Sequence, residues 1–261
     1  MILPFNLTDV RVGFLLSLLV FVGIAFALLY SAKVSVNIPP IGRVNWRDAV
    51  TVLVGLVVTP AILTVVPTFY LAAWIGLSFV AGVYTLLSPV VRYRLLAFGL
   101  AIGLTLGQFQ LRSIWLNDFL VILAVSIAAV FFVQGGIRLR EVTYMAAGYS
   151  IFDVFAIRIL QPILFRIFSG IALVPMLLMP YGGVTLSVGG GDLLLVTVFT
   201  LILKKEYGIM RAIALLATEL SIIFAASLLV GIVSVVPLSP LLTLPFAVMS
   251  LGRKPATVKS T

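Results

Sequence analysis

The sequence contains no cysteine and no histidine, and only 10% of its residues are charged. Without cysteine there are neither disulfides nor thiolate nucleophiles, and without histidine there are no Ser-His triads, HExxH zinc sites or imidazole proton relays. Carboxylates are therefore the only ordinary acid–base groups near neutral pH. They are also scarce, with 8 aspartates and glutamates against 17 lysines and arginines, which gives a net charge of +9.

Hydrophobic residues are what the chain has in excess. They make up 62% of its 261 residues, and the mean hydropathy is +1.28. A chain of this length with average composition would form one or two soluble domains, whereas this composition indicates a polytopic membrane protein in contact with a lipid bilayer. Its cations belong mainly to loops that face an anionic cytoplasmic leaflet, and nucleic acid is not an expected partner.

Long apolar runs, separated by charges, prolines and glycines, divide the sequence into transmembrane helices of about 20 residues. The nine expected spans are 12–30, 49–66, 69–88, 95–111, 119–136, 142–168, 184–203, 212–233 and 238–251. The first run lacks the basic region and cleavage site of a secretory signal, so we interpret it as a span. The expected fold is all-α, with one membrane domain over 1–261: spans one to five at about 12–136, six to nine at about 142–251, and a short basic tail at 252–261.

The loop cations predict the orientation of the chain. With nine spans the termini lie on opposite sides of the membrane, and the cations divide unequally between the two sides. The smaller set is Arg11, Arg112, Arg158 and Arg166; the larger set is Lys33, Arg43, Arg47, Arg92, Arg94, Arg138, Arg140, Lys204, Lys205, Arg211, Arg253, Lys254 and Lys259. The positive-inside rule then places the C-terminus in the cytoplasm and the N-terminus outside.

Three carboxylates fall inside the expected spans, namely Asp153, Asp192 and Glu219. An ionisable group there costs about 3 kcal/mol to insert and is by default a candidate functional residue, although a hydrogen bond or ion pair between helices is the structural alternative. The other carboxylates lie beside loop cations or at span ends, where solvated or paired surface charge explains them: Asp9, Asp48, Asp118, Glu141 and Glu206.

Depth brings two of the three carboxylates together. Asp153 lies 13 residues after Arg140, the last cation before its span. Asp192 lies 12 residues before Lys204. Both are therefore roughly 18–20 Å from the cytoplasmic face, on consecutive antiparallel spans, and we expect them to meet. Glu219 is only about 12 Å deep, and the sequence identifies no partner for it.

Two facing aspartates supply an acid and a base at once. Like charges about 3 Å apart cannot both ionise, so such a pair shares one proton. The ionised member deprotonates a water that attacks a peptide carbonyl, and the protonated member donates to the carbonyl oxygen and then to the leaving amine. This chemistry needs a water-filled cavity that reaches both side chains.

Glycine and proline flank these positions. Gly189, Gly190 and Gly191 precede Asp192; they weaken a helix and leave room for another backbone to approach. A loosened strand edge there would offer main-chain hydrogen bonds to an unwound substrate helix, while close helix packing by small residues is the alternative. The segment Pro240-Leu241-Leu242 follows Pro237 at the start of the last span, where a proline-loosened backbone would likewise expose carbonyls.

Three motifs, in order, resemble those of a known family. Phe152-Asp153-Val154-Phe155 in span six, Gly189-Gly190-Gly191-Asp192 in span seven and Pro240-Leu241-Leu242 entering span nine are similar to the YD, GxGD and PAL motifs of the presenilin and signal peptide peptidase family of intramembrane aspartyl proteases. Weaker matches are Trp115 with Asn117, the apolar segment from Pro175 to Pro180, and Lys204-Lys205. The resemblance covers about residues 115–245.

The resemblance implies a function and a set of site residues. Asp153 and Asp192 would be the catalytic pair, and Phe152, Gly189–Gly191 and Pro240-Leu241-Leu242 would bind or shape the approach of the substrate, without a metal or organic cofactor. The sequence departs from the family in having Phe152 for the usual tyrosine, Leu241 for the alanine of PAL, and a short connection between spans six and seven without an evident site for autoproteolysis.

Orientation extends what the resemblance implies. A cytoplasmic C-terminus matches signal peptide peptidase, whereas presenilin is inverted. The expected substrates are therefore transmembrane helices with a cytoplasmic N-terminus, such as remnant signal peptides or type II membrane proteins, cleaved without an obligatory partner subunit. The short chain without cysteine or histidine suggests a prokaryotic or archaeal cell membrane.

Two other readings stay open at the level of sequence. In the first, the protein is a proton- or ion-coupled transporter in which Asp153, Asp192 and Glu219 bind ions at broken helices. That reading predicts inverted-repeat symmetry, and the sequence shows no such repeat. In the second, the protein is a non-catalytic scaffold or chaperone for membrane helices, whose activity would survive Asp153→Asn.

Overall fold

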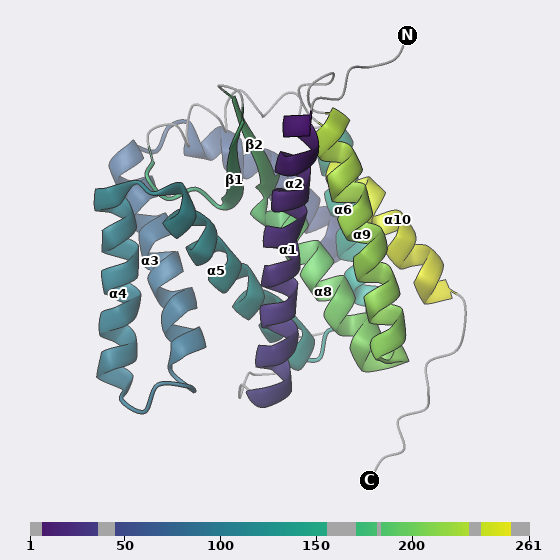
Figure 1. Ribbon diagram of the computed structural model, residues 1–261, viewed down its shortest axis with the longest axis horizontal. Helices are drawn as coiled ribbons and strands as arrows, with labels where there is room; N and C mark the ends of the chain where they lie inside the picture. The colour runs from purple at the N-terminus through teal and green to yellow at the C-terminus, as the bar shows by residue number, and fades with distance from the viewer. Residues whose placement is uncertain (1–6, 36–44, 156–170, 182–183, 230–235, 252–261) are drawn as a thin grey trace.

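The structure is a computed structural model that describes residues 7–35, 45–155, 171–181, 184–229 and 236–251. It is mostly helical, with one two-stranded hairpin (Figure 1). The elements in chain order are α1 (Leu7–Lys33), α2 (Trp46–Leu63), α3 (Thr68–Leu87), α4 (Arg94–Leu111), α5 (Ile114–Gln134), α6 (Leu139–Phe155), β1 (Met176–Tyr181), β2 (Val184–Gly189), α8 (Gly190–Tyr207), α9 (Ile209–Leu229) and α10 (Leu238–Leu251).

The composition of the helices is that of an integral membrane protein. Within the described ranges, 5 helices are long and apolar enough to cross a bilayer, at Val10–Lys33, Thr68–Leu87, Arg94–Leu111, Ile114–Gln134 and Ile209–Leu229, and Leu238–Ser250 is a shorter apolar helix. Many large apolar side chains are exposed, among them Phe14, Phe69, Leu77, Leu95 and Leu244. So many exposed large apolar side chains are unusual for a soluble monomer, and lipid is the solvent that suits them.

The hairpin was not expected, and it changes the seventh span. We expected a helix over 184–203, but residues 184–189 form β2, antiparallel to β1, and α8 begins only at Gly190. The residues of β2 are Val-Thr-Leu-Ser-Val-Gly, rich in β-branched side chains that favour an extended backbone. The apolar segment from Pro175 to Pro180, expected only as a connection between spans, supplies most of β1.

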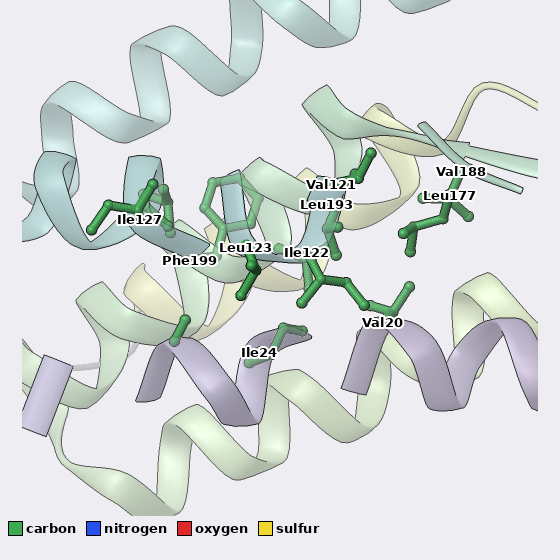
Figure 2. Packing of buried hydrophobic residues seen from close by; sticks show 14 of the residues in the cluster. Val20, Ile24, Val121, Ile122, Leu123, Ile127, Leu177, Val188, Leu193 and Phe199 are labelled. Atoms are coloured by element: carbon green, nitrogen blue, oxygen red, sulfur yellow. The ribbon is translucent and has the colours of Figure 1, made fainter. Parts of the chain in front are cut away.

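The core forms where α1, α5, α8 and the hairpin meet. Figure 2 shows Val20 and Ile24 of α1 against Ile122 of α5 and Leu193 of α8. The backbone of α1 comes close to α5 at Gly23, whose carbonyl accepts a hydrogen bond from Ser126 Oγ at 3.1 Å. In Figure 1 the α3–α4 pair lies on one side of this core, and α9 and α10 lie on the other.

Side-chain hydrogen bonds tie several helices together at the end opposite to the hairpin. Gln134 Nε2 donates to Val34 O at 2.7 Å, and Lys205 Nζ donates to Val133 O at 3.1 Å. The end thus joins the last turns of α1, α5 and α8 to the starts of α6 and α9 (Figure 1). It gathers a group of cations that the sequence assigned to one side: Lys33, Arg138, Arg140, Lys204, Lys205 and Arg211.

The last helix, α10, packs against both α6 and α8. Ser150 Oγ of α6 and Thr243 Oγ1 of α10 are hydrogen-bonded at 3.1 Å. Phe246 of α10 stacks on Phe199 of α8, with the ring centroids 3.9 Å apart. Between these contacts α10 contains Pro245, which has no N–H to donate to the preceding turn of the helix.

Candidate functional site

Asp153 lies near the end of the described part of α6, with only 3% of its surface exposed. Its Oδ2 accepts two hydrogen bonds from Ser239, one from the backbone N–H at 3.0 Å and one from the hydroxyl at 2.9 Å. The backbone N–H of Leu238 lies near the same carboxylate. The first turn of α10 therefore holds the Asp153 side chain in place.

Asp192 lies in the first turn of α8 and is 9% exposed. The turn begins there because Gly189 is extended, with φ −61° and ψ 142°, and ends β2. An acidic residue in a first turn is favoured by the free N–H groups of the helix start. In contrast to Asp153, Oδ1 of Asp192 is buried without a hydrogen-bond partner among the described residues.

The two aspartates come together as expected. Helices α6 and α8 are in contact, and the two carboxylates are close enough for their charges to interact electrostatically. Tyr149, one helical turn before Asp153, interacts electrostatically with both carboxylates. The site is thus a pair of buried carboxylates, one held by donors and one with an unpartnered oxygen, beside a phenol hydroxyl.

The glycines before Asp192 allow close approach by other parts of the same chain. Gly190 donates its N–H to Pro175 O at 2.9 Å, and a Cβ at Gly190 would lie 2.7 Å from that oxygen. A Cβ at Gly191 would overlap the Tyr149 hydroxyl. A Cβ at Gly189 would lie 3.2 Å from Asp192 Oδ2. The space of the missing Cβ is therefore occupied by the Pro175 carbonyl at Gly190 and by the Tyr149 hydroxyl at Gly191, and it adjoins the Asp192 carboxylate at Gly189.

The other residues singled out from the sequence have different surroundings. Phe152 is buried, with its ring centroid 6.1 Å from that of Tyr149. Leu242 is fully buried in the core, whereas Leu241 is 43% exposed and Pro240 is half-buried. Pro240 follows Ser239 in the first turn of α10, where a residue without an N–H is tolerated.

Two polar residues of α5 hold the hairpin. Asn117 accepts the N–H of Val174 and donates to Met176 O, both at 2.9 Å. Asp118 Oδ1 accepts the N–H of Leu178 at 2.8 Å. We expected Asp118 to be a surface charge, but it is 1% exposed. The expectation was wrong because the strand, which the helix-only reading omitted, covers it and supplies the donor.

Glu219 is fully buried on α9, away from this pair. It faces α8, where the Thr200 hydroxyl is near its carboxyl group without forming a hydrogen bond of good geometry. Thr200 is eight residues after Asp192, which is about 12 Å along a helix. In the described part of the chain, no three acidic residues converge on a common point.

Sequence reasoning missed Ser239 and Tyr149. A signal for each was present: Ser-Pro at the start of an apolar run is typical of a helix start, and Tyr149 is four residues before Asp153, on the same helical face. The second part of the expected sixth span, 156–168, which contains Arg158 and Arg166, lies outside the described residues. No family model matches the chain, and no curated protein is detectably similar to it in sequence.

Proposed function

We propose that the protein is an intramembrane aspartyl protease of the presenilin and signal peptide peptidase type, with nine transmembrane helices and with Asp153 and Asp192 as its catalytic pair. The observation that carries the proposal is the pair itself: two buried carboxylates from adjacent helices that interact electrostatically in a mostly apolar molecule. An unpaired buried carboxylate is costly, and a pair of like charge is more so. Such an arrangement is typical of an active site rather than of a structural contact.

The pair supports peptide hydrolysis by shared-proton chemistry. In the proposed reaction the two carboxylates hold one proton between them, so one acts as the base for water while the other acts as the acid for the peptide carbonyl and then for the leaving amine. Neither metal nor organic cofactor takes part in the proposed reaction. The unpartnered Oδ1 of Asp192 is the oxygen left available to carry the shared proton toward the substrate.

The hairpin supports binding of an extended substrate. A transmembrane helix must unwind before its peptide bonds are accessible, and its released N–H and C=O groups need new partners inside the membrane. One edge of β1 bonds to α5 through Asn117 and Asp118, and the other pairs with β2. The remaining edge is that of β2, which leads through Gly189 directly to Asp192, and strand addition there would place a peptide next to the pair.

We infer the substrate class from orientation. With the N-terminus outside and the C-terminus in the cytoplasm, the site would accept helices whose N-terminus is cytoplasmic, such as remnant signal peptides or type II membrane proteins. The proposed protein acts without an obligatory partner subunit, in a prokaryotic or archaeal cell membrane.

Glu219 is the observation that favours a second candidate, an ion- or proton-coupled transporter. It is a fully buried carboxyl group for which peptide hydrolysis has no role. A transporter that uses Asp153, Asp192 and Glu219 at one site requires them to converge. The spacing of about 12 Å along α8 between Asp192 and Thr200, the neighbour of Glu219, favours the protease.

Cleavage of a reporter by purified, liposome-reconstituted protein tests the proposal. The reporter is a type II helical peptide, and product masses locate the cut. We expect wild type to cut within the hydrophobic stretch, and Asp153→Asn and Asp192→Asn each to lose at least about 100-fold in rate, because each removes an acid–base group. Asp48→Asn, which changes an exposed carboxylate in the first turn of α2, is the matched control and should retain the wild-type rate.

Equal rates for wild type and both active-site variants, across several reporters and pH values, would contradict the protease. In that case flux driven by a pH gradient in the same liposomes, sensitive to Glu219→Gln, would support the transporter.

A further inference from the structure

Ser239 is a hydrogen-bond partner of Asp153 and is itself completely buried. It donates twice to one carboxylate oxygen, with its N–H and with its hydroxyl. Its hydroxyl is therefore directed across the helix interface to α6 and does not cap its own helix. The serine hydroxyl adds a second donor to the backbone N–H of the same residue, whereas the next residue, Pro240, has no N–H to donate.

The contact also places the carboxylate at a helix start. α10 has 14 residues, and its first N–H groups have no partner within the helix. Asp153 accepts the N–H of Ser239, and the N–H of Leu238 lies near the same carboxylate. The partial positive charge of a helix start and its free N–H groups stabilise an anion. The Ser239 hydroxyl adds one more donor to the same oxygen.

The donors are divided unequally between the two aspartates. Asp153 receives at least the two bonds from Ser239, whereas Asp192 Oδ1 has no partner within the described residues. Hydrogen bonds to a carboxylate favour its ionised form, and a carboxyl oxygen without donors suits the protonated form. We propose that Ser239 is a positioning residue that holds Asp153 as the ionised member of the pair, the base, and leaves the shared proton on Asp192, the acid.

The inference rests on the proposed protease function for its mechanistic meaning. The protonation of Asp153 also depends on the charged and titratable side chains near it. Among the described residues, the titratable side chains that interact with Asp153 are Asp192 of α8 and Tyr149 of α6. α10 carries no ionisable side chain. α2 also packs against α6, and its charged residues, Arg47 and Asp48, are exposed in its first turn.

Ser239→Ala tests the inference, with Ser150→Ala as the matched control. Each variant removes one side-chain hydrogen bond between α6 and α10. Ser239 bonds to Asp153, and Ser150, three residues before Asp153, bonds to Thr243. Only Ser239→Ala removes a donor to the carboxylate. Its backbone N–H remains, so we expect a partial loss of about ten-fold in kcat, an unchanged KM, and an acidic limb of the pH–rate profile moved to higher pH. Ser150→Ala should keep the wild-type profile, and Ser239→Thr, which keeps the hydroxyl, should restore it.

A second readout does not depend on activity. Infrared titration of the reconstituted protein follows the C=O stretch of protonated carboxyl groups, and the band missing in Asp153→Asn belongs to Asp153. We expect this band to appear at higher pH in Ser239→Ala than in wild type and in Ser150→Ala, because the ionised form has lost a donor.

Three outcomes would overturn the inference: an Asp153 band unmoved by Ser239→Ala, an equal shift in Ser150→Ala, or a loss of rate at all pH values without movement of the acidic limb. The last would assign Ser239 a structural role only. Absence of cleavage by wild type would contradict the proposed function instead, and the infrared titration would still decide whether Ser239 sets the protonation of Asp153.

Discussion

At the scale of single residues, the site depends on glycines, which leave space for neighbouring groups, as much as on its carboxylates. Gly190 and Gly191 stand where the hairpin and the Tyr149 ring come against the first turn of α8. The carbonyl of Pro175 both accepts the Gly190 N–H and fills the space of a Cβ. A methyl group there has no room, since the atom it would meet is backbone.

We therefore predict that Gly190→Ala destabilises the protein by about 1–3 kcal/mol, as overpacking does, and lowers the cleavage rate by displacing Asp192. The control is Gly103→Ala in the middle of α4, where a Cβ would meet nothing within 4 Å. Alanine is favoured there by up to about 1 kcal/mol. Thermal unfolding in detergent measures both, and equal midpoints for the two variants would show that the contact with Pro175 is unimportant.

Sequence patterns were informative about residues where a charge conflicts with its surroundings. Asp153 and Asp192 were identified because carboxylates are costly in an apolar span, and the structure buries both and brings them together. The roles of Ser239 and Asp118 were missed. Serine costs little free energy in any environment, and Asp118 lies near the end of a helix, where a surface charge is common. Their importance depends on the strand or helix opposite to them, which no local pattern encodes.

At the scale of elements, the hairpin is an unusual component of this mostly helical molecule. The sequence of β2, Val-Thr-Leu-Ser-Val-Gly, is apolar and rich in β-branched residues. Such a short apolar run is compatible with a strand or with the start of a helix. The prediction of helix over 184–203 was wrong for its first six residues because an apolar run alone does not distinguish the two. The other expected helix ends agree with the structure within five residues, because charges and prolines mark them; the ends expected at 168 and 233 lie outside the described residues.

The polar groups of α5 should set the stability of this hairpin. Asn117→Ala leaves the Val174 N–H and the Met176 C=O unpaired, and each buried orphan group costs about 1–3 kcal/mol. We expect the amides around Val174 and Leu178 to exchange hydrogen at least about ten-fold faster, and cleavage to slow in parallel.

Ser126→Ala is the control for this experiment. It removes a hydrogen bond from the same helix, but to the Gly23 carbonyl of α1. Hydrogen exchange in the hairpin should not change in this variant. If exchange in Asn117→Ala is also unchanged, α5 does not hold the strand.

At the scale of the whole molecule, the ends of the helices define two faces. Several cations gather at one end of the helices. Hydrogen bonds from Gln134 to Val34 and from Lys205 to Val133 join helix ends there, which indicates that these ends share a side of the membrane. Together with the positive-inside rule they predict a cytoplasmic location for this end and for the C-terminus.

Single introduced cysteines test the orientation, and the cysteine-free sequence provides a clean background. In intact cells we expect a membrane-impermeant maleimide to label Asp9→Cys and to spare Lys259→Cys. Permeabilised cells should give labelling of both variants. Labelling of Lys259→Cys in intact cells would invert the orientation, and with it the expected direction of the substrate.

The contacts of α10 have a mechanical consequence. This helix reaches one aspartate-bearing helix through Ser239 and the other through the ring of Phe246. α10 therefore contacts both helices that carry the acids, in addition to the direct contact between α6 and α8. Pro245 leaves the Leu241 carbonyl without its helical partner, between these two points of attachment. A bend of α10 at Pro245 would move Ser239 relative to Phe246, and with it the Asp153 carboxylate relative to α8.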